Sequence, residues 1–351
     1  MRIAQVAPLY ESVPPKYYGG TERVVSYLTE ELVRQGHEVT LFASGDSMTK
    51  ARLVAACRRS LRLDKHCIDQ LAYHLVMLEH VFQRAAEFDI VHFHVDYLHF
   101  STSRRQQITH VTTLHGRLDI PDLLPLYQEF RDMPVISISN VQREPLPWAN
   151  WQATVYHGLP ADLYRFRAQP GSYLAFLGRI SPEKRVDRAI EIAKRIQIPL
   201  KIAAKVDRVD KKYFKTVIEP LLHDSLVEVV GEIGDREKDE FLGNAYALLS
   251  PIDWPEPFGL VMIEAMACGT PVIAYRGGAV PEIIEEGQTG FIVEEVEDAL
   301  EAARRIPKLS RKHCREVFEQ RFTATRMAND YVRVYERLIN RKQNEPLEVR
   351  A

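Results

Sequence analysis

The chain has 351 residues and a formal net charge of −2, with 46% hydrophobic and 27% charged residues, a composition typical of a globular protein large enough for two domains. Lys and Arg number 18 against 18 Asp and Glu in residues 1–168, and 28 against 30 in the rest, so neither half has the positive excess of a nucleic-acid binder. The four cysteines show no CxxC pair, no apolar stretch reaches the roughly 20 residues that span a bilayer, and no signal peptide is recognisable, so we expect a cytoplasmic protein without a transmembrane segment.

The first half alternates short apolar runs with amphipathic stretches. Residues 2–9 read as a buried strand, residues 21–36 have helical spacing with Thr21 as a candidate cap, and residues 37–44 read as the next strand. This β-α-β unit predicts a parallel sheet. The composition of the stretch from Thr49 to Phe88 predicts helix. Further strands are predicted at 89–95, 110–116 and 134–139, and from residue 153 onward.

The pattern restarts after residues 166–171, a polar segment with Pro170 and Gly171 that is a candidate linker. Strands are predicted at 173–180, 199–206, 227–233, 246–252, 270–275 and 289–294. Helices are predicted at 182–196, 210–223, 235–245, 257–269 and 280–287. The chain thus divides into two α/β halves of similar size, and in such folds ligands bind at the carboxyl ends of the strands, here in a cleft between the domains.

The segment PEPFGLVMIEAMACG carries two acids, Glu256 and Glu264, separated by seven residues. Prolines on both sides place Glu256 on a rigid loop, and a helix is expected to begin near Phe258 or Gly259, with an anion site at its start. A carboxylate at Glu264, within that helix, can accept hydrogen bonds from two vicinal hydroxyls such as those of a ribose. The alternative is a loop acid followed by a solvated helix acid.

The segment FLGRISPEK lies at the end of a predicted strand and opens the next predicted helix. Gly178 permits the turn, and Arg179 and Lys184 bring two cations to the strand's carboxyl end, an arrangement that suits a diphosphate. The alternative is a pair of ordinary surface cations.

The pair Gly19-Gly20 lies between the first strand and its helix, where a phosphate loop would lie. It is neither GxGxxG nor a Walker loop, so it predicts neither NAD nor ATP chemistry. A plain turn is the alternative.

Histidines cluster on two predicted strands. His115 ends one of them, at the edge where an α/β domain binds its ligand. His92 and His94 alternate and could share a face, but no third ligand has a zinc-type spacing, so no metal site is predicted.

A basic stretch contains Arg52, Arg58, Arg59 and Arg62. It could meet an acidic acceptor or a membrane surface. A solvated helix face is the alternative.

Several of these segments, in this order, resemble the family 4 retaining glycosyltransferases of the GT-B fold. GGTERVVSYLTEELVRQGHEVTLFA is similar to that family's glycine loop and first helix, and FLGRISPEK resembles its diphosphate motif. PEPFGLVMIEAMACGTPVIA matches the acid-x7-acid signature, and GGAVPEIIEEGQTGFIV matches the family's next segment. The resemblance covers essentially the whole chain and implies an α/β protein with two Rossmann-like domains whose parallel sheets face each other across a cleft.

The resemblance also implies roles for matching positions. Arg179 and Lys184 would hold the diphosphate and Glu264 the ribose, while Glu256 would contact hydroxyls of the donor sugar. The backbone of Phe258, Gly259 and Leu260 would close around sugar and phosphate, and Gly19 and Gly20 would lie across the cleft by the phosphate. His115 would lie beside the sugar and the attacking hydroxyl. With His115 and Glu256 as catalytic residues, no metal and no cofactor beyond the donor substrate would be needed.

The implied domains are 1–168 on the acceptor side, 169–322 for the nucleotide sugar, and a terminal helix within 323–351 that packs back on the first domain. The expected reaction moves a hexose from a nucleoside diphosphate sugar, with a uridine nucleotide expected, to an acceptor hydroxyl with retention. The acceptor is left open among a small molecule, a glycan and a lipid-linked molecule, with peripheral membrane contact also open. A nucleotide-sugar epimerase and a non-catalytic sugar-nucleotide-binding subunit are the alternatives. The chain departs from the family pattern at Arg185 and at His157-Gly158-Leu159.

Overall fold

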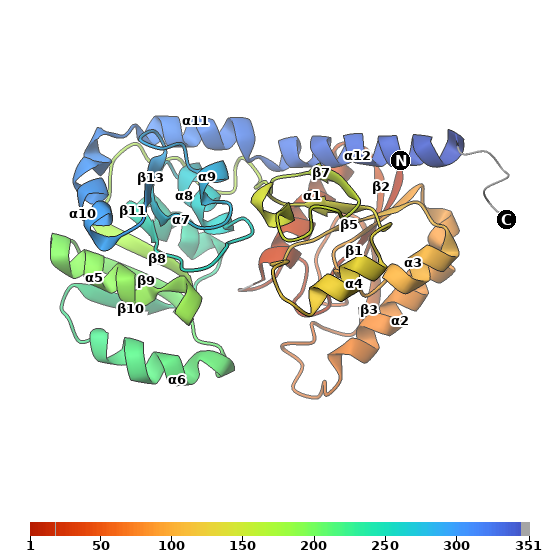
Figure 1. Cartoon of the computed structure of the whole chain (residues 1–351), viewed down its shortest axis with the longest axis horizontal. Helices are drawn as coiled ribbons and strands as arrows, with labels where there is room; N and C mark the ends of the chain where they lie inside the picture. Colours follow the sequence, from red (N-terminus) through yellow and green to blue (C-terminus); the bar gives the residue numbers. More distant parts are fainter. Residues whose placement is uncertain (18, 345–351) are drawn as a thin grey trace. The chain divides into compact units, whose positions relative to one another are not determined.

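The computed structural model describes residues 1–17 and 19–344, which form two compact α/β units (Figure 1). Unit 1 comprises Met1–Gly158 and the C-terminal helix from Ala324, and unit 2 comprises Leu159–Thr323. The division therefore falls after residue 158, earlier than the boundary at 168 expected from the sequence. The expected α/β architecture, with one parallel sheet in each unit, is confirmed.

The sheet of unit 1 has seven strands, all parallel, in the order β3-β2-β1-β4-β5-β6-β7. They are β1 Arg2–Val6, β2 Glu38–Ser44, β3 Arg52–Cys57, β4 Ile90–Phe93, β5 His110–Thr113, β6 Val135–Ser137 and β7 Trp151–Thr154. The strand order reverses between β1 and β4, and ligands bind beside such a reversal in doubly wound sheets.

Helices cover both faces of this sheet. Helices α1 (Gly20–Arg34) and α12 (Ala324–Asn344) lie against each other on one face. Helix α2 (Gln70–Gln83) covers the other face, where Met77 and Val81 pack with Phe42 and Phe93. Because side chains alternate along a strand, His92 and His94 of the β4 region point away from α2 and toward α12. Two short helices complete the unit, α3 Phe100–Gln106 and α4 Leu123–Glu129.

Two predictions for unit 1 were wrong. The stretch from Thr49 to Phe88 is not all helix, because residues 52–57 form β3 and pair with β2. The apolar run around Leu53 and Val54 takes the sheet edge, and α2 begins only at Gln70. The basic stretch is therefore an edge strand and the loop after it, rather than a solvated helix face. Thr21 is not the cap of α1, since Gly19 holds the N-cap position.

The sheet of unit 2 has six strands in the order β10-β9-β8-β11-β12-β13. They are β8 Tyr173–Arg179, β9 Leu200–Lys205, β10 Val227–Gly231, β11 Ala245–Ser250, β12 Val272–Tyr275 and β13 Gly290–Val293. The helices are α5 Val186–Ile196, α6 Lys211–Tyr213, α7 Asp235–Gly243, α8 Leu260–Ala267, α9 Val280–Ile283, α10 Val296–Arg305 and α11 Arg311–Arg321. Helices α5 and α10 pack together, and α8 packs on α7 and α11.

Several helices of unit 2 differ from their predicted bounds. The helix expected at 182–196 opens with a 3₁₀ turn, Pro182–Lys184, and α5 begins only at Val186. The helix expected at 210–223 is a series of short turns that includes α6 and a π-helical turn, Phe214–Ile218, and Pro220, which lacks an amide proton, sits in its last turn. The helix expected at 280–287 ends at Ile283. Helix α8 begins at Leu260, close to the start expected near Phe258 or Gly259, and ends at Ala267.

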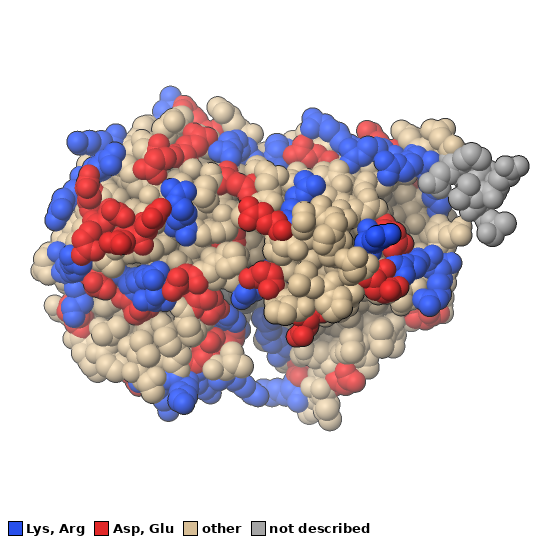
Figure 2. All heavy atoms as spheres, in the orientation of Figure 1, with Lys and Arg blue, Asp and Glu red and all other residues tan. Residues whose placement is uncertain are grey.

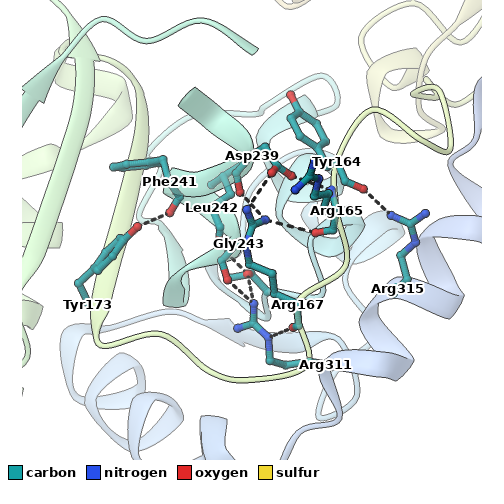
Figure 3. Close-up of polar contacts among 11 residues, drawn as sticks. Tyr164, Arg165, Arg167, Tyr173, Asp239, Phe241, Leu242, Gly243, Arg311 and Arg315 are labelled. Carbon is teal, nitrogen blue, oxygen red and sulfur yellow. Dashed lines mark hydrogen bonds and ion pairs between the residues drawn. The ribbon is translucent and has the colours of Figure 1, made fainter. Parts of the chain in front are cut away.

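The segment expected to be a linker is fastened to unit 2 (Figure 3). Arg167 pairs with Asp239 at 2.8 Å, and the backbone carbonyl of Arg167 accepts a hydrogen bond from Arg311 at 2.7 Å. Arg311 also donates to the carbonyl of Gly243 at the end of α7. These contacts explain why residues 159–168 belong to unit 2 rather than forming a free connection.

Positive and negative side chains are interspersed over the face shown in Figure 2, as expected for a chain with balanced charge. No described helix combines the length and the apolar character that crossing a bilayer requires.

Candidate active site

The topology of unit 2 brings two of the predicted segments to neighbouring strands. Strands β8 and β11 pair with each other where the strand order reverses. Arg179 is the last residue of β8, and the loop that holds Glu256 runs from the end of β11 to α8. The carboxyl ends of these strands form the position where doubly wound sheets bind ligands.

Arg179 is surrounded by carboxylates. Its guanidinium pairs with Glu183, and it lies 3.6 Å from carboxylate oxygens of both Asp207 and Asp210. Burial raises the pKa of the Asp210 carboxyl, and the charge of Arg179 opposes that rise. These acids hold the guanidinium at the end of β8. Sequence spacing gave no signal for Asp207 and Asp210, which lie in the loop after β9.

Lys184 and Glu256, predicted in separate motifs, form an ion pair with each other. The Lys184 ammonium lies 4.8 Å from the centre of the Trp254 ring, and the Trp254 indole donates a hydrogen bond to Glu256 Oε2 at 3.2 Å. The amide of Asp253 donates to the Glu183 carbonyl at 2.8 Å. The diphosphate-type motif and the acid loop are therefore joined by side chains and by backbone.

The Gly277-Gly278 pair packs closely against the backbone of the Glu256 loop. Gly278 has a φ of +52°, and a Cβ at this position would lie 2.1 Å from the carbonyl oxygen of Glu256. The neighbouring amide of Ala279 donates to that same oxygen at 2.9 Å. Such close backbone approach requires glycine, so this part of the sequence supports the acid loop.

Helix α8 starts directly after the acid loop. Gly259 holds the N-cap position with a φ of +88°, which favours glycine, and Phe258 is buried with its ring at the edge of Phe322. Glycine supplies no side-chain cap, so the amides of the first turn, beginning at Leu260, can bind an anion.

Glu264 lies in the second turn of α8 and is buried, with 2% of its surface exposed. Its Oε1 accepts a hydrogen bond from the Lys238 ammonium at 2.8 Å and another from the Tyr164 hydroxyl at 3.4 Å. Lys238 comes from α7 and Tyr164 from the segment before β8. No sequence spacing links either residue to Glu264, so both were missed.

Gly19 and Gly20 connect to α1 in unit 1. Gly19 has a φ of +154°, and a Cβ there would lie 2.8 Å from Pro15 and 3.2 Å from the carboxylate of Glu22. The loop therefore needs glycine. Burial raises the pKa of Glu22, while hydrogen bonds from the backbone oppose the rise. Negative charge already lies beside this loop, which opposes a second anion unless Glu22 is protonated.

His115 lies just after β5 in unit 1 and is half-buried. Its Nε2 lies 2.8 Å from His94 Nδ1, and its ring stacks on that of His157 with centres 5.3 Å apart. His94 Nε2 in turn lies 2.8 Å from the amide oxygen of Gln5. Burial lowers the pKa of His115 to about 3 and the pKa of His94 well below its usual value, so both rings are neutral near pH 7.

The hydrogen bonds of this relay determine which nitrogen carries each proton. An amide oxygen only accepts, so His94 Nε2 donates to Gln5 and His94 Nδ1 has a lone pair. His115 Nε2 must then donate to His94 Nδ1. His115 Nδ1 is left as an acceptor, and it has no hydrogen-bond partner in the described part of the chain. This nitrogen is buried, so a hydroxyl would reach it only after neighbouring side chains shift.

His92 and His94 share a face as expected, yet their ring nitrogens are engaged by protein groups. His92 Nδ1 lies 2.7 Å from the Tyr335 hydroxyl and Nε2 lies 2.7 Å from the Thr113 hydroxyl. Among residues 1–17 and 19–344, no group of three or more His, Cys, Asp or Glu side chains is placed to hold a metal ion.

Two family models match the chain in two overlapping parts. Residues 18–179 match "Glycosyltransferase Family 4", and residues 166–321 match "Glycosyl transferases group 1". An uncharacterized glycosyltransferase of Methanocaldococcus jannaschii is 27% identical over 202 residues, which are 53% of this chain and 54% of that protein. The matches span about half, or less, of the length of the curated relatives.

Solved structures match over nearly the whole chain. The sucrose-phosphate synthase of Thermosynechococcus elongatus has a TM-score of 0.79 at 20% identity, covering 97% of this chain and 100% of its own. HepE of Anabaena, solved in complex with UDP and glucose, has a TM-score of 0.73 at 18% identity, covering 96% and 99%. At these identities the likeness concerns the fold.

Proposed function

Because the chain belongs to the group 1 and family 4 glycosyltransferases and has the GT-B fold, we propose that it moves a hexose from a UDP-sugar to an acceptor hydroxyl with retention of configuration. The observation that carries this proposal is the pairing of Lys184 with Glu256 beside Arg179, at the strand reversal of unit 2. The complex of the Anabaena relative with UDP and glucose supports a uridine donor.

In the proposed site, unit 2 binds the donor. Arg179, Lys184 and the first amides of α8, around Gly259 and Leu260, neutralise the diphosphate, whose charge grows as the sugar leaves. Lys184 moves from Glu256 to the diphosphate, and the Glu256 carboxylate then accepts hydrogen bonds from the sugar. These groups replace the charge that a divalent metal would otherwise supply, so the reaction needs no metal.

Glu264 is proposed to accept hydrogen bonds from the two ribose hydroxyls. Lys238 donates to the carboxylate at 2.8 Å and orients it. A charged acceptor binds a diol more strongly than a neutral one, because hydrogen bonds to charged groups are the stronger class.

Unit 1 is proposed to serve the acceptor side. The lone pair of His115 Nδ1 accepts a hydrogen bond from a sugar or acceptor hydroxyl, and Gln5 and His94 act as positioning residues because they keep the proton on Nε2. Gly19 and Gly20 form the glycine loop of this unit. The residual alternatives are an epimerase and a non-catalytic binding subunit. Intact Arg179 and Glu256 favour the transferase.

The proposal is tested by melting the protein with UDP, GDP and ADP in the presence of a chelator. Ligands that bind the folded state raise the melting temperature by mass action, so UDP should give the largest shift and Arg179→Ala should abolish most of it. Lys211→Ala removes an exposed cation from the same unit and should leave the shift intact. Equal shifts for all three nucleotides, or a full shift in Arg179→Ala, would refute the proposed donor site.

A further inference from the structure

Exposed apolar side chains gather in one segment of unit 1. Of the 18 large apolar side chains that are exposed among the described residues, six fall within residues 63–76. They are Leu63, Ile68, Leu71, Tyr73, Leu75 and Val76. The exposed fractions reach 99% for Ile68 and about half for Leu71, Leu75 and Val76. Single exposed apolar residues are ordinary, but a contiguous group marks an interaction surface.

These exposed side chains lie just before helix α2 and in its first turns. Helix α2 is held by its inner face, where Met77, Leu78, Val81 and Phe82 are buried in the core, and Asp69 caps its first turn through bonds to the amides of Leu71 and Ala72. With the inner face fixed, the helical period directs Val76 to the outside and places Leu75 at the flank. Leu71 falls on the same side as the buried Leu78, but it lies in the first turn and is about half exposed. No charged side chain lies between Gln70 and Val76, whereas Glu79 and Gln83, farther along the same outer face, bond each other.

The segment directly before α2 is basic. Residues 58–66 contain Arg58, Arg59, Arg62 and Lys65 against a single acid, Asp64, a formal balance of four positive charges to one negative. Arg59 pairs with Asp64 at 2.9 Å and Arg62 pairs with Glu11 at 3.2 Å. Arg58 and Lys65 are exposed and form no ion pair with any other residue the structure describes. This segment forms the orange loop at the lower end of unit 1 in Figure 1.

We propose that the basic loop and the exposed apolar side chains of the first turns of α2, residues 58–76, bind the surface of an anionic lipid bilayer. Aliphatic side chains that insert at the level of the lipid headgroups, with adjacent cations for anionic lipids, are the combination by which proteins lie on a bilayer without crossing it. A second copy of the chain fits less well, since a two-fold contact would bring the same cations together. Nucleic acid fits less well because the apolar residues are mainly aliphatic and offer little base stacking.

This surface is attached to the carboxyl edge of the sheet. The amide of Leu61 donates to the carbonyl of Leu9 at 2.9 Å, and the amide of Arg62 donates to the carbonyl of Tyr10 at 3.0 Å. The amide of Leu9 donates to His74 of α2 at 3.0 Å. Leu9 and Tyr10 come after β1, so a bilayer bound here would lie beside the sheet edge at which His115 comes after β5. The binding itself does not depend on sugar transfer.

The test is flotation of the full chain with vesicles of phosphatidylcholine, alone or with about 30 mol% phosphatidylglycerol. Wild-type protein should float with the anionic vesicles, less at high salt, and little with the neutral ones. Arg58→Gln with Lys65→Gln should weaken binding about 25-fold, taking about five-fold for each cation. Leu71→Ser with Leu75→Ser should weaken it at least tenfold. All four side chains are exposed, so circular dichroism should show the native fold.

Matched controls lie in unit 2. Lys211→Gln with Lys212→Gln removes two exposed cations, and Val209→Ser with Val217→Ser removes two exposed apolar groups; both should float like wild type. Absence of wild-type flotation, or equal flotation of the unit 1 and unit 2 variants, would overturn the proposal. A third outcome would also overturn it: wild-type protein sediments as a dimer, and Leu71→Ser with Leu75→Ser makes it a monomer without changing its flotation. The surface would then join two copies of the chain.

Discussion

Replacing the buried pair Lys238–Glu264, one residue at a time and then together, distinguishes a structural role of Glu264 from a role in nucleotide binding. The pair is 2.8 Å long and its side chains are 12% and 3% exposed. Glu264→Met leaves an ammonium buried without its counter-charge, so the free energy of unfolding should fall by about 3 kcal/mol. If the carboxylate also binds the ribose diol, two charge-assisted hydrogen bonds are lost and the Kd for UDP should rise about 100-fold, equivalent to about 3 kcal/mol.

Adding Lys238→Met to Glu264→Met removes the stranded charge, and replacement of a whole buried pair by apolar residues is often neutral for stability. The double variant should therefore regain most of its stability in urea titrations, while calorimetry should still give the weakened UDP affinity. Recovery of both properties together would show that Glu264 only supports the fold, and the ribose assignment would have to be abandoned.

Three further predictions concern the rest of the site. Arg179→Ala and Lys184→Ala should lower turnover on the order of 100-fold with little change in melting temperature, because their pairs are partly exposed; a collapsed melting temperature with normal turnover of the folded fraction would mark them as structural. His115→Ala should lower turnover by roughly 10²–10⁴-fold, with chelator present throughout and UDP affinity unchanged; a fully active variant would remove His115 from the site. Burial lowers the pKa of His110 to about 4 and of His115 to about 3, so these rings stay neutral in the folded state while the unfolded chain takes up protons below about pH 6.5. As the pH falls from 6.5 toward the pKa of the folded state, each such histidine should lower the free energy of unfolding by about 1.4 kcal/mol per pH unit. Urea titrations at several pH values measure this free energy, and a value that does not change with pH would contradict buried neutral rings.

Much of the fold could be predicted from periodicity. The alternation of apolar runs and amphipathic stretches correctly indicated parallel sheets, and Gly and Pro near Glu256 correctly placed it on a loop. The prediction of helix across 49–88 was wrong for residues 52–57, although the stretch is rich in Ala, Leu and Arg, which favour helix. Pairing with β2, which a local pattern cannot register, makes residues 52–57 an edge strand.

The candidate site could be predicted only in part, because contacts between distant parts of the chain leave no local pattern. Arg179, Lys184, Glu256 and Glu264 each lie in a recognisable local motif. Lys238 reaches Glu264 from another helix, and such long-range contacts leave no spacing in the sequence. The proton arrangement of His115 depends on Gln5, a residue far away along the chain that reads only as part of a strand.

The proposed sugar transfer is tested most directly by monitoring UDP-hexoses with the protein and a chelator by proton NMR, with water as the slow acceptor. We expect release of UDP together with free sugar that first appears in the anomeric configuration of the donor, and loss of this turnover in Lys184→Ala. Conversion of the donor to an epimer with its diphosphate intact would identify an epimerase. Tight binding of UDP-sugars without any turnover, or sugar released first as the opposite anomer, would contradict a retaining transferase.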